Sequence, residues 1–158
     1  MTSTTIDPRL EHDISFAEAP GGQPVLTAYR DSRGYWTIGR GHLLEPQQHD
    51  WTGYTISAED EQKLFDADIL SAVHFAMRLP EWAACDTACR QNALSELCFN
   101  MRGRWLGFVH CRAAWRAQDW PEAKYQLLDS DWEHQVGPGR ADRIAGYILT
   151  GHYPSAAP

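Results

Sequence analysis

The sequence has no long hydrophobic run. No stretch approaches the roughly 18 consecutive apolar residues that a membrane-spanning helix needs. The first ten residues, MTSTTIDPRL, lack the basic segment and apolar core of a secretory signal peptide. We therefore expect a soluble protein without a leader or a membrane anchor. At 158 residues, the chain is long enough for one domain with a substantial core and too short for two ordinary ones.

Positive charge is also scarce. The chain has 14 Lys and Arg against 21 Asp and Glu, which gives a formal net charge of −7. A nucleic-acid-binding protein presents a stripe of Lys and Arg that displaces counterions from the phosphates, and no such stripe is present. We therefore expect no nucleic-acid partner. Arg30, Arg33 and Arg40 are read either as a solvated strand face or as contacts to an anionic ligand.

Cysteine is rare as well, with four residues in the chain: Cys85, Cys89, Cys98 and Cys111. Cys85 and Cys89 are four residues apart on an expected helix, which is half of a metal site. No second pair of Cys or His follows at the spacing of a zinc finger. We expect buried free thiols, as in a protein made in a reducing compartment, and neither a metal nor another cofactor.

Helical and strand patterns follow one another in the N-terminal part of the chain. Asp7 as an N-cap and Pro8 in the first turn predict a helix over residues 7–18, which the segment APGGQP ends. In residues 25–44, β-branched and aromatic residues become frequent. The tetrapeptide DSRG between LTAY and YWTI predicts a hairpin whose turn needs a positive φ at Gly34. A small antiparallel sheet is therefore expected after the first helix.

The rest of the chain is predicted to be helical. Ser57, followed by Asp60 three residues later, predicts the start of a long helix that Pro80 ends. Further helices are expected at about 84–101, 106–117, 120–128 and in RADRIAGYILTG, which Gly151 closes. The predicted fold class is α+β and mostly helical. The expected single domain has an N-terminal lobe over about 7–56, a connecting helix over about 57–78 and a helical lobe over about 79–152.

Two carboxylates and a hydroxyl lie where the first helix meets the hairpin. Glu18 ends the helix and Asp31 enters the turn, while Thr37 is expected across the hairpin from Asp31. At that spacing the hydroxyl and the carboxylate would share one water. A water held beside an acid and a base is what an inverting glycosidase needs. Turn initiation by Asp31 and an ordinary strand position for Thr37 explain the same pattern.

The segment ISFAE…LTAYRDSRGYWTIGRGHLL resembles the N-terminal signature of the phage-type lysozymes, the endolysin muramidases of glycoside hydrolase family 24. In that signature a Glu is followed by Tyr-x-Asp and by Thr-Ile-Gly-x-Gly-His. ISAEDEQKLFDADILSAV, RQNALSELCFNM and DWEHQVGPGRADRIAGYILTG resemble later segments of the family in the same order. The resemblance implies a lysozyme-like fold. It also implies hydrolysis, with inversion, of the β-1,4 bond between N-acetylmuramic acid and N-acetylglucosamine during bacterial cell lysis.

The resemblance also implies roles for single residues. Glu18 matches the general acid that protonates the glycosidic oxygen, Asp31 matches the carboxylate that activates the attacking water, and Thr37 matches the threonine that holds that water. Arg140 matches an arginine that pairs with the catalytic Glu, which would lower the pKa of that carboxyl group. Burial must oppose this shift, because a general acid has to be protonated when it acts.

Further residues are expected to support the fold or the substrate. By the resemblance, His42 and Asp68 form a structural ion pair between the hairpin and the long helix. Glu96 and Asn100, four residues apart on the central helix, are expected to line the substrate groove, with Arg140 beside them. Trp36, or Trp105 in its place, is a candidate platform for stacking against a sugar, although most tryptophans are expected to belong to the core.

The sequence departs from the family pattern beside the acid. APGGQP lengthens the gap between Glu18 and the Tyr-x-Asp segment. This added loop either narrows the groove or contacts the substrate, or it means that the acid is Glu11. The spacing of Ile14 and Glu18 fits the family helix better, and we favour Glu18.

Two functions from other classes remain open. A lytic transglycosylase cleaves the same bond with one acid and no water, and the presence of Asp31 and Thr37 argues against it. A non-catalytic peptidoglycan-binding protein on the same fold would bind cell walls without releasing reducing ends. The family is usually made in the cytoplasm of a bacterial host and released through a holin, and delivery by a tail or a secretion device is a variant. We expect a monomer that acts on the wall and, being acidic, attacks intact cells weakly from outside.

Overall fold

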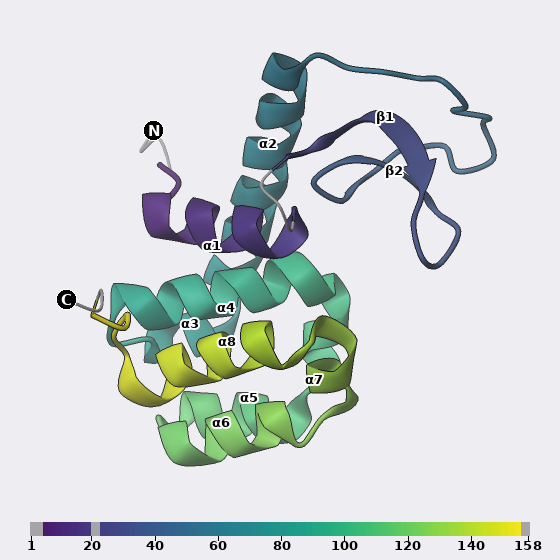
Figure 1. Ribbon diagram of the computed structural model, residues 1–158. Coiled ribbons are helices and arrows are strands. Elements are labelled where there is room, and N and C mark those ends of the chain that lie inside the picture. The colour runs from purple at the N-terminus through teal and green to yellow at the C-terminus, as the bar shows by residue number, and fades with distance from the viewer. Residues whose placement is uncertain (1–4, 20–22, 156–158) are drawn as a thin grey trace. The chain divides into compact units, whose positions relative to one another are not determined.

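The computed structural model describes residues 5–19 and 23–155 (Figure 1). Within them the chain forms eight α-helices, one short 3-10 helix and one three-stranded antiparallel sheet. The predicted α+β, mostly helical class is confirmed. The chain divides into two compact units, residues 1–71 and 72–158, and the boundary lies inside helix α2. None of the helices in the described part has the length and apolar character that a membrane span requires.

The first unit begins with helix α1, Pro8–Glu18. The Asp7 side chain accepts a hydrogen bond from the backbone N of Arg9 at 2.8 Å, which confirms the predicted N-cap. This bond satisfies one of the orphan N–H groups of the first turn, and Pro8 has no N–H to satisfy. The prediction about the APGGQP loop falls largely on residues 20–22, which lie outside the described residues.

The sheet of the first unit has the order β1-β2-β3, with strands Val25–Arg30, Trp36–Gly39 and His42–Leu43. Gly34 has φ +82° and its N–H donates to the carbonyl of Asp31 at 2.9 Å, so the predicted turn is confirmed. A small core covers one side of the sheet: Trp36, Ile38 and Leu44, with Ala28, Trp51, Ile56 and Leu64 packed against them.

Helix α2, Ala58–Met77, starts as predicted. The Ser57 hydroxyl accepts a hydrogen bond from the backbone N of Asp60 at 3.0 Å, and three acidic residues in the first turn favour the positive end of the helix dipole. After α2 the structure differs from the prediction, because Pro80 opens a separate short helix, α3, Pro80–Ala84. A five-residue helix is too short to produce a periodicity that the sequence would show.

The second unit is helical and is built around the buried helix α4. Its later elements are α4 Ala88–Met101, the 3-10 helix η1 Arg102–Gly107, α5 Val109–Arg116, α6 Trp120–Leu128, α7 Asp131–Val136 and α8 Pro138–Thr150. One core joins them, and it includes the fully buried Trp105 and Trp115. Trp105 was a candidate sugar platform, and its complete burial makes that prediction wrong.

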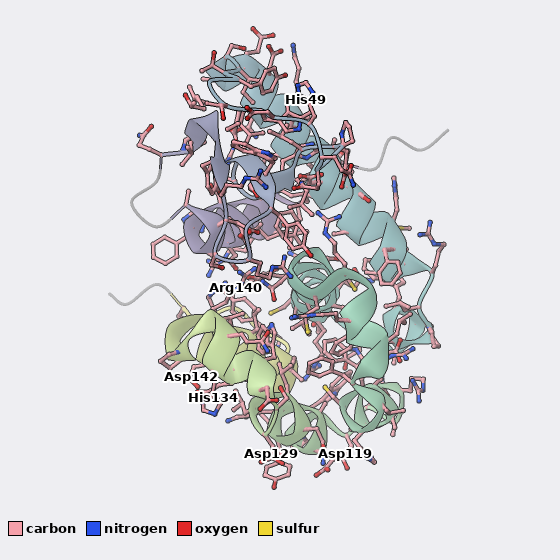
Figure 2. All side chains as sticks on the ribbon, turned by 90° about the vertical axis from the view of Figure 1, so that its right-hand side faces the viewer. His49, Asp119, Asp129, His134, Arg140 and Asp142 are labelled. Atoms are coloured by element: carbon pink, nitrogen blue, oxygen red, sulfur yellow. The ribbon has the colours of Figure 1, made fainter. Side chains whose placement is uncertain are left out.

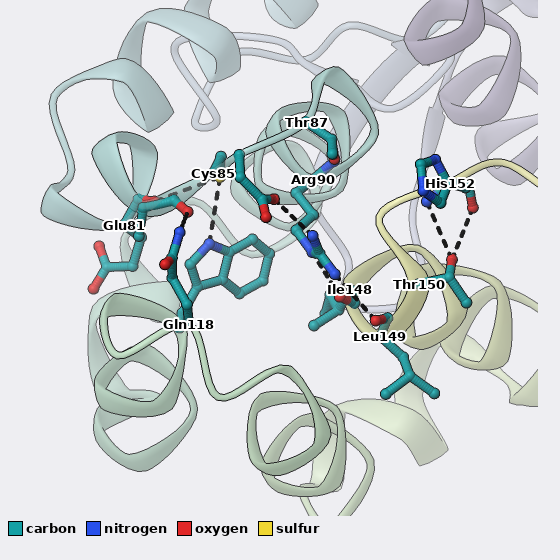
Figure 3. A network of polar contacts seen from close by, with 12 residues as sticks. Glu81, Cys85, Thr87, Arg90, Gln118, Ile148, Leu149, Thr150 and His152 are labelled. Carbon is teal, nitrogen blue, oxygen red and sulfur yellow. Dashed lines mark hydrogen bonds and ion pairs between the residues drawn. The ribbon is translucent and has the colours of Figure 1, made fainter.

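Arg90 of α4 secures the end of α8 (Figure 3). Its Nε donates to the carbonyl of Ile148 at 2.8 Å and its Nη2 donates to the carbonyl of Leu149 at 3.0 Å. These are two of the carbonyls that the end of a helix leaves without a partner. Oδ1 of Asp86 lies 2.6 Å from Nη1 of the same guanidinium. The guanidinium carbon lies 4.0 Å from the centre of the Trp120 ring. A single arginine therefore fixes α8 to α4.

None of the four cysteines forms a disulfide bond. Cys89, Cys98 and Cys111 are buried, as expected, whereas Cys85 is only half-buried. Burial raises the pKa of Cys85 to about 11 and the pKa of Cys98 and of Cys111 to about 12, from an ordinary value of 9.0. The absence of a metal stays a prediction.

We predict that replacing Gly151 by Ala destabilises the protein, while replacing Gly146 by Ala does not. Gly151 closes α8 with φ +69°, and an added Cβ would lie 2.6 Å from Nη1 of Arg90. An L-residue in this conformation costs roughly 1–2 kcal/mol, and the clash adds to that cost. Gly146 lies inside α8 with nothing within 4 Å of an added Cβ, so Ala should stabilise the helix there. Urea unfolding of both variants tests this, and equal midpoints would contradict it.

The thiol pKa values predict a loss of stability in alkaline solution. A thiol pKa that is higher in the folded than in the unfolded state stabilises the fold fully below pH 9.0, and this contribution is lost as the pH rises toward 12. The free energy of unfolding should therefore fall between pH 9 and pH 11, and less in a Cys98→Ala variant that still folds. At pH 8, iodoacetamide should leave the buried thiols unmodified until urea is added, as mass spectrometry can establish.

Candidate active site

The pairing of β1 with β2 places three polar side chains on one face of the sheet. Tyr29 lies directly opposite Thr37. Asp31 follows Tyr29 by two residues, and side chains two apart on an extended chain point to the same side. Thr37 is therefore diagonal to Asp31. The predicted position of Thr37, directly across the hairpin from Asp31, is wrong. Diagonal neighbours have Cα atoms about 7–8 Å apart, which leaves room for one water between short side chains.

The difference arises because Asp31 is part of the turn. Its carboxylate Oδ1 accepts hydrogen bonds from the backbone N–H groups of Arg33 and Tyr35, both at 2.9 Å. Its other oxygen, Oδ2, accepts no hydrogen bond among the described residues, and its side chain is 22% exposed. One oxygen thus holds the hairpin tip, and the other is available to a ligand.

The Thr37 hydroxyl is oriented by the same hairpin. Thr37 is 2% exposed, and its Oγ1 donates to the carbonyl of Tyr35 at 3.0 Å. Because a hydroxyl has one proton, Oγ1 can only accept a hydrogen bond from a water. Asp31 Oδ2 can also only accept. A water between them would direct both of its hydrogens at the protein and its lone pairs away from it, which is the orientation of a nucleophile.

Glu18 faces the turn between β2 and β3. Its Oε2 lies 3.6 Å from the position that a Cβ on Gly41 would occupy. Glu11, the alternative acid, is two helical turns earlier, and its Oε1 accepts a hydrogen bond from Gln62 at 3.1 Å. Glu18 thus lies on the hairpin side and Glu11 contacts α2, and the choice of Glu18 as the acid stays a prediction.

Tyr29 is a polar residue of this site that the sequence reasoning did not select. Burial raises the pKa of its phenol, and the charges of Asp31 and Glu18 raise it further. The phenol therefore stays protonated at neutral pH and lies within the electrostatic field of both carboxylates. The Tyr-x-Asp spacing carried the signal, since residues two apart on a strand share a face.

The hairpin is anchored by a buried ion pair between Arg40 and Glu61 of α2. The guanidinium Nε and Nη2 lie 3.0 and 2.8 Å from the two carboxylate oxygens, and the side chains are 9% and 2% exposed. Nη1 donates to the Ser15 hydroxyl of α1 at 3.0 Å, and the ring of Phe65 lies under the guanidinium at 3.7 Å. For Arg40 both predicted alternatives, a solvated face and a ligand contact, are wrong.

A second contact joins the sheet to α2. His42 Nδ1 of β3 lies 2.9 Å from Oδ2 of Asp68. The structure thus brings together the two residues that the family resemblance pairs. Neither residue belongs to the face that carries Asp31 and Thr37, and a structural role for the pair stays a prediction.

Two predicted ligand contacts of the second unit are already used within it. Glu96 of α4 is 1% exposed, and its oxygens lie 3.2 Å from Nε of Arg140 and 2.7 and 2.9 Å from the Nη atoms of Arg143. Arg140 lies in the first turn of α8 (Figure 2). Asn100 Oδ1 accepts a hydrogen bond from Trp132 Nε1 at 2.7 Å. The prediction that Glu96 lines a groove is therefore wrong, while the same role for the half-buried Asn100 stays a prediction.

The predictions for Trp36 as a sugar platform and for Arg140 as the partner of Glu18 have different outcomes. Trp36 is 8% exposed, it belongs to the sheet core, and the guanidinium carbon of Arg30 lies 4.1 Å from its ring centre. A buried and covered ring cannot stack on a sugar, so the predicted platform is wrong. The pairing of Arg140 with Glu18, which belongs to the first unit, stays a prediction.

Comparison with known proteins shows the family to which the chain belongs. The sequence model of the phage lysozyme family matches residues 23–146. The chain belongs to the phage lysozyme family. The part of this phage lysozyme that the family match covers includes Asp31, Thr37, His42 and Asp68, and it begins after Glu18. The small sheet, the long helix and the helical unit thus form an α+β lysozyme-like fold.

Two curated proteins are similar to this chain. The pre-baseplate central spike protein Gp5 of Enterobacteria phage T4 is 32% identical over 153 residues, which cover 82% of this chain and 26% of that protein. The chain thus spans about a quarter of that relative. The probable T4-type lysozyme 1 of Dictyostelium discoideum is 24% identical over 149 residues, which cover 80% of this chain and 87% of that protein.

We predict that Gly39→Ala destabilises the protein more than Gly34→Ala. Both glycines have a positive φ, so each substitution incurs roughly 1–2 kcal/mol of backbone strain. At Gly39 the new Cβ would also lie 2.7 Å from Cγ and 2.8 Å from Oε1 of Glu61, whereas nothing lies within 4 Å at Gly34. The difference between the two melting temperatures therefore measures the closeness of the hairpin to α2. An equal loss in both variants would contradict that packing.

Proposed function

We propose that this phage lysozyme hydrolyses the β-1,4 bond between N-acetylmuramic acid and N-acetylglucosamine in peptidoglycan, with inversion at the anomeric carbon. Membership in the family indicates peptidoglycan hydrolysis. The observation that carries the finer proposal is the hairpin face on which Asp31 Oδ2 and Thr37 Oγ1 are both left as acceptors. Two acceptors on one face suit a water with its lone pairs directed outward.

The proposed reaction uses three side chains. The water oxygen attacks the anomeric carbon as the bond from that carbon to the glycosidic oxygen breaks. Glu18 donates its proton to the leaving oxygen, and Asp31 Oδ2 takes a proton from the water, while Thr37 accepts the second hydrogen bond of that water. An inverting glycosidase needs room for this water, with its two carboxyl groups about 6.5–9.5 Å apart. The two carboxyl groups exchange their protons with solvent before the next turnover.

The turn contributes to this reaction by holding the base in place. Two backbone N–H groups fix Oδ1 of Asp31, so its carboxylate does not reorient when the substrate arrives. The neutral Tyr29 phenol supplies a hydrogen-bond donor at the same face. These contacts also explain why the arrangement favours hydrolysis over a transglycosylase reaction, which uses no water and would need neither Thr37 nor Asp31 on this face.

We place the reaction in bacterial cell lysis. The enzyme would be made as a monomer in the cytoplasm of a bacterial host and would reach the wall after release through a holin. Delivery as part of a larger particle is the alternative, and it gains support from the relative that is named as a baseplate central spike protein. The net charge of −7 would weaken the approach to anionic cell surfaces from outside at low salt.

We predict that Glu18→Gln and Asp31→Asn each lower the release of reducing ends from purified peptidoglycan by about 10²–10⁴-fold, the usual contribution of a general acid or base. Glu11→Gln is the matched control and should keep near wild-type activity. Circular dichroism and thermal melting establish that each variant is folded.

Mass spectrometry of the products separates the alternatives. Hydrated reducing ends support the proposal, and inversion is read by NMR from the anomer that forms first. Anhydro-muramyl ends would assign the enzyme to the transglycosylases. Full activity in Glu18→Gln with loss in Glu11→Gln would move the acid to Glu11. Binding of wild-type protein to cell walls without any product would leave a non-catalytic binding protein.

A further inference from the structure

Arg33 lies at the tip of the hairpin beside the proposed base. Its side chain is 66% exposed, and its backbone N–H is fixed by Oδ1 of Asp31. Its guanidinium carbon lies 5.3 Å from the centre of the Tyr35 ring, while its Nε is 4.0 Å from Oδ2 of Asp31, which is beyond hydrogen-bond distance. Among the described residues this guanidinium donates no hydrogen bond. It is a positioned cation whose donors remain available.

The other two arginines of the hairpin are already used by the fold. Arg40 is buried against Glu61. Arg30 pairs across the strands with Trp36, on the face opposite to Asp31, where its Nη1 donates to the carbonyl of Gly34 at 2.8 Å. Arg33 differs from both, because its guanidinium contacts only the Tyr35 ring and the distant oxygen of Asp31 among the described residues of the hairpin, and neither contact uses its N–H donors in a hydrogen bond.

The ligand that fits this cation is a carboxylate. The planar fork of a guanidinium matches the two oxygens of a carboxylate, and such charge-assisted bonds are stronger than neutral ones. Within the proposed function, the stem peptides of peptidoglycan bring carboxylates close to the glycan strand, whereas a neutral polymer of N-acetylglucosamine has none. The site itself contains the carboxyl groups of Glu18 and Asp31 in a chain of net charge −7, so an anionic substituent needs a local cation to approach.

We propose that Arg33 binds a free carboxylate of the stem peptide, and that this contact makes the enzyme prefer strands whose stem carboxylates are free over strands whose stem carboxylates are amidated. The inference rests on the proposed function, because it takes peptidoglycan as the ligand of this face. Arg33 acts as a specificity residue. It contacts the peptide, not the bond that breaks.

The test compares two forms of one ligand. Glycan strands whose stem peptides have free carboxylates, and the same strands after carbodiimide coupling to ammonia has converted those carboxylates to neutral amides, are offered to wild type, Arg33→Gln, Arg33→Glu and Arg33→Lys. Lys63→Gln is the charge-matched control, because Lys63 on α2 is also 66% exposed and its nearest ion-pair partners are Glu59 and Asp60 of its own helix. Affinity and release of reducing ends are measured separately for both ligands.

We expect wild type to bind the strands with free stem carboxylates about tenfold more tightly than the amidated strands, the effect of one exposed charge-assisted contact. Arg33→Gln should remove this preference, Arg33→Glu should reverse it, and Arg33→Lys should keep part of it as a point charge. Lys63→Gln should leave the ratio unchanged. Added salt should reduce the wild-type preference.

The two readings fail in different ways. A wild-type ratio near one, or a ratio that Arg33→Glu leaves unchanged, overturns the role of Arg33, whatever the hydrolysis shows. A ratio that depends on Arg33, without release of reducing ends from either ligand, supports the peptide contact and overturns the proposed reaction. If the loss of Arg33 acted only by disturbing the proposed base, Asp31, hydrolysis of both ligands would fall equally. The ratio of the two affinities would then stay unchanged.

Discussion

The ion pair between Arg40 and Glu61 is the interaction on which the first unit depends. Its three strands are short, β3 has two residues, and so small a sheet has little stability of its own. Arg40 compensates by bonding Glu61 of α2 and Ser15 of α1 from a single guanidinium. Removing one partner of such a buried pair costs roughly 3–5 kcal/mol, because the other charge is left buried without compensation. The face with Asp31 and Thr37 is held in shape by a contact on another part of the sheet.

The second unit uses the same device. Arg90 bonds the last carbonyls of α8, and Arg140 and Arg143 bond the buried Glu96, so that both ends of α8 are fixed to α4 by arginines. In an acidic protein most positive charge would be expected on the surface, where it aids solubility and contact with anionic ligands. Here a large share of the arginines is inside, paired or capping. The exposed Arg33 stands out against that pattern.

The sequence was informative wherever a local signal decided the structure. Asp7, Ser57, Gly34 and Gly151 act on their own backbone or on residues within one turn, and each lies where the pattern indicates. The short helices α3 and α7 were not predicted, because fewer than two turns give no periodicity. The burial of Arg40, Glu96 and Trp36 depends on partners 11 to 47 residues away, which no local pattern contains. The direction of the Thr37 hydroxyl likewise required the strand register.

Asp31 combines a structural role in the hairpin turn with a proposed chemical role as the base. Its Oδ1 closes the hairpin tip, and its Oδ2 is the oxygen that we propose as the base, so one carboxylate carries both roles. A descendant of this protein that lost its activity would still need an acceptor at that tip. Asn retains the acceptor oxygen, while Ala or a larger apolar residue does not. Among inactive relatives, Asn is therefore the replacement of Asp31 that we expect most often. Such a relative would keep the shape of the hairpin tip.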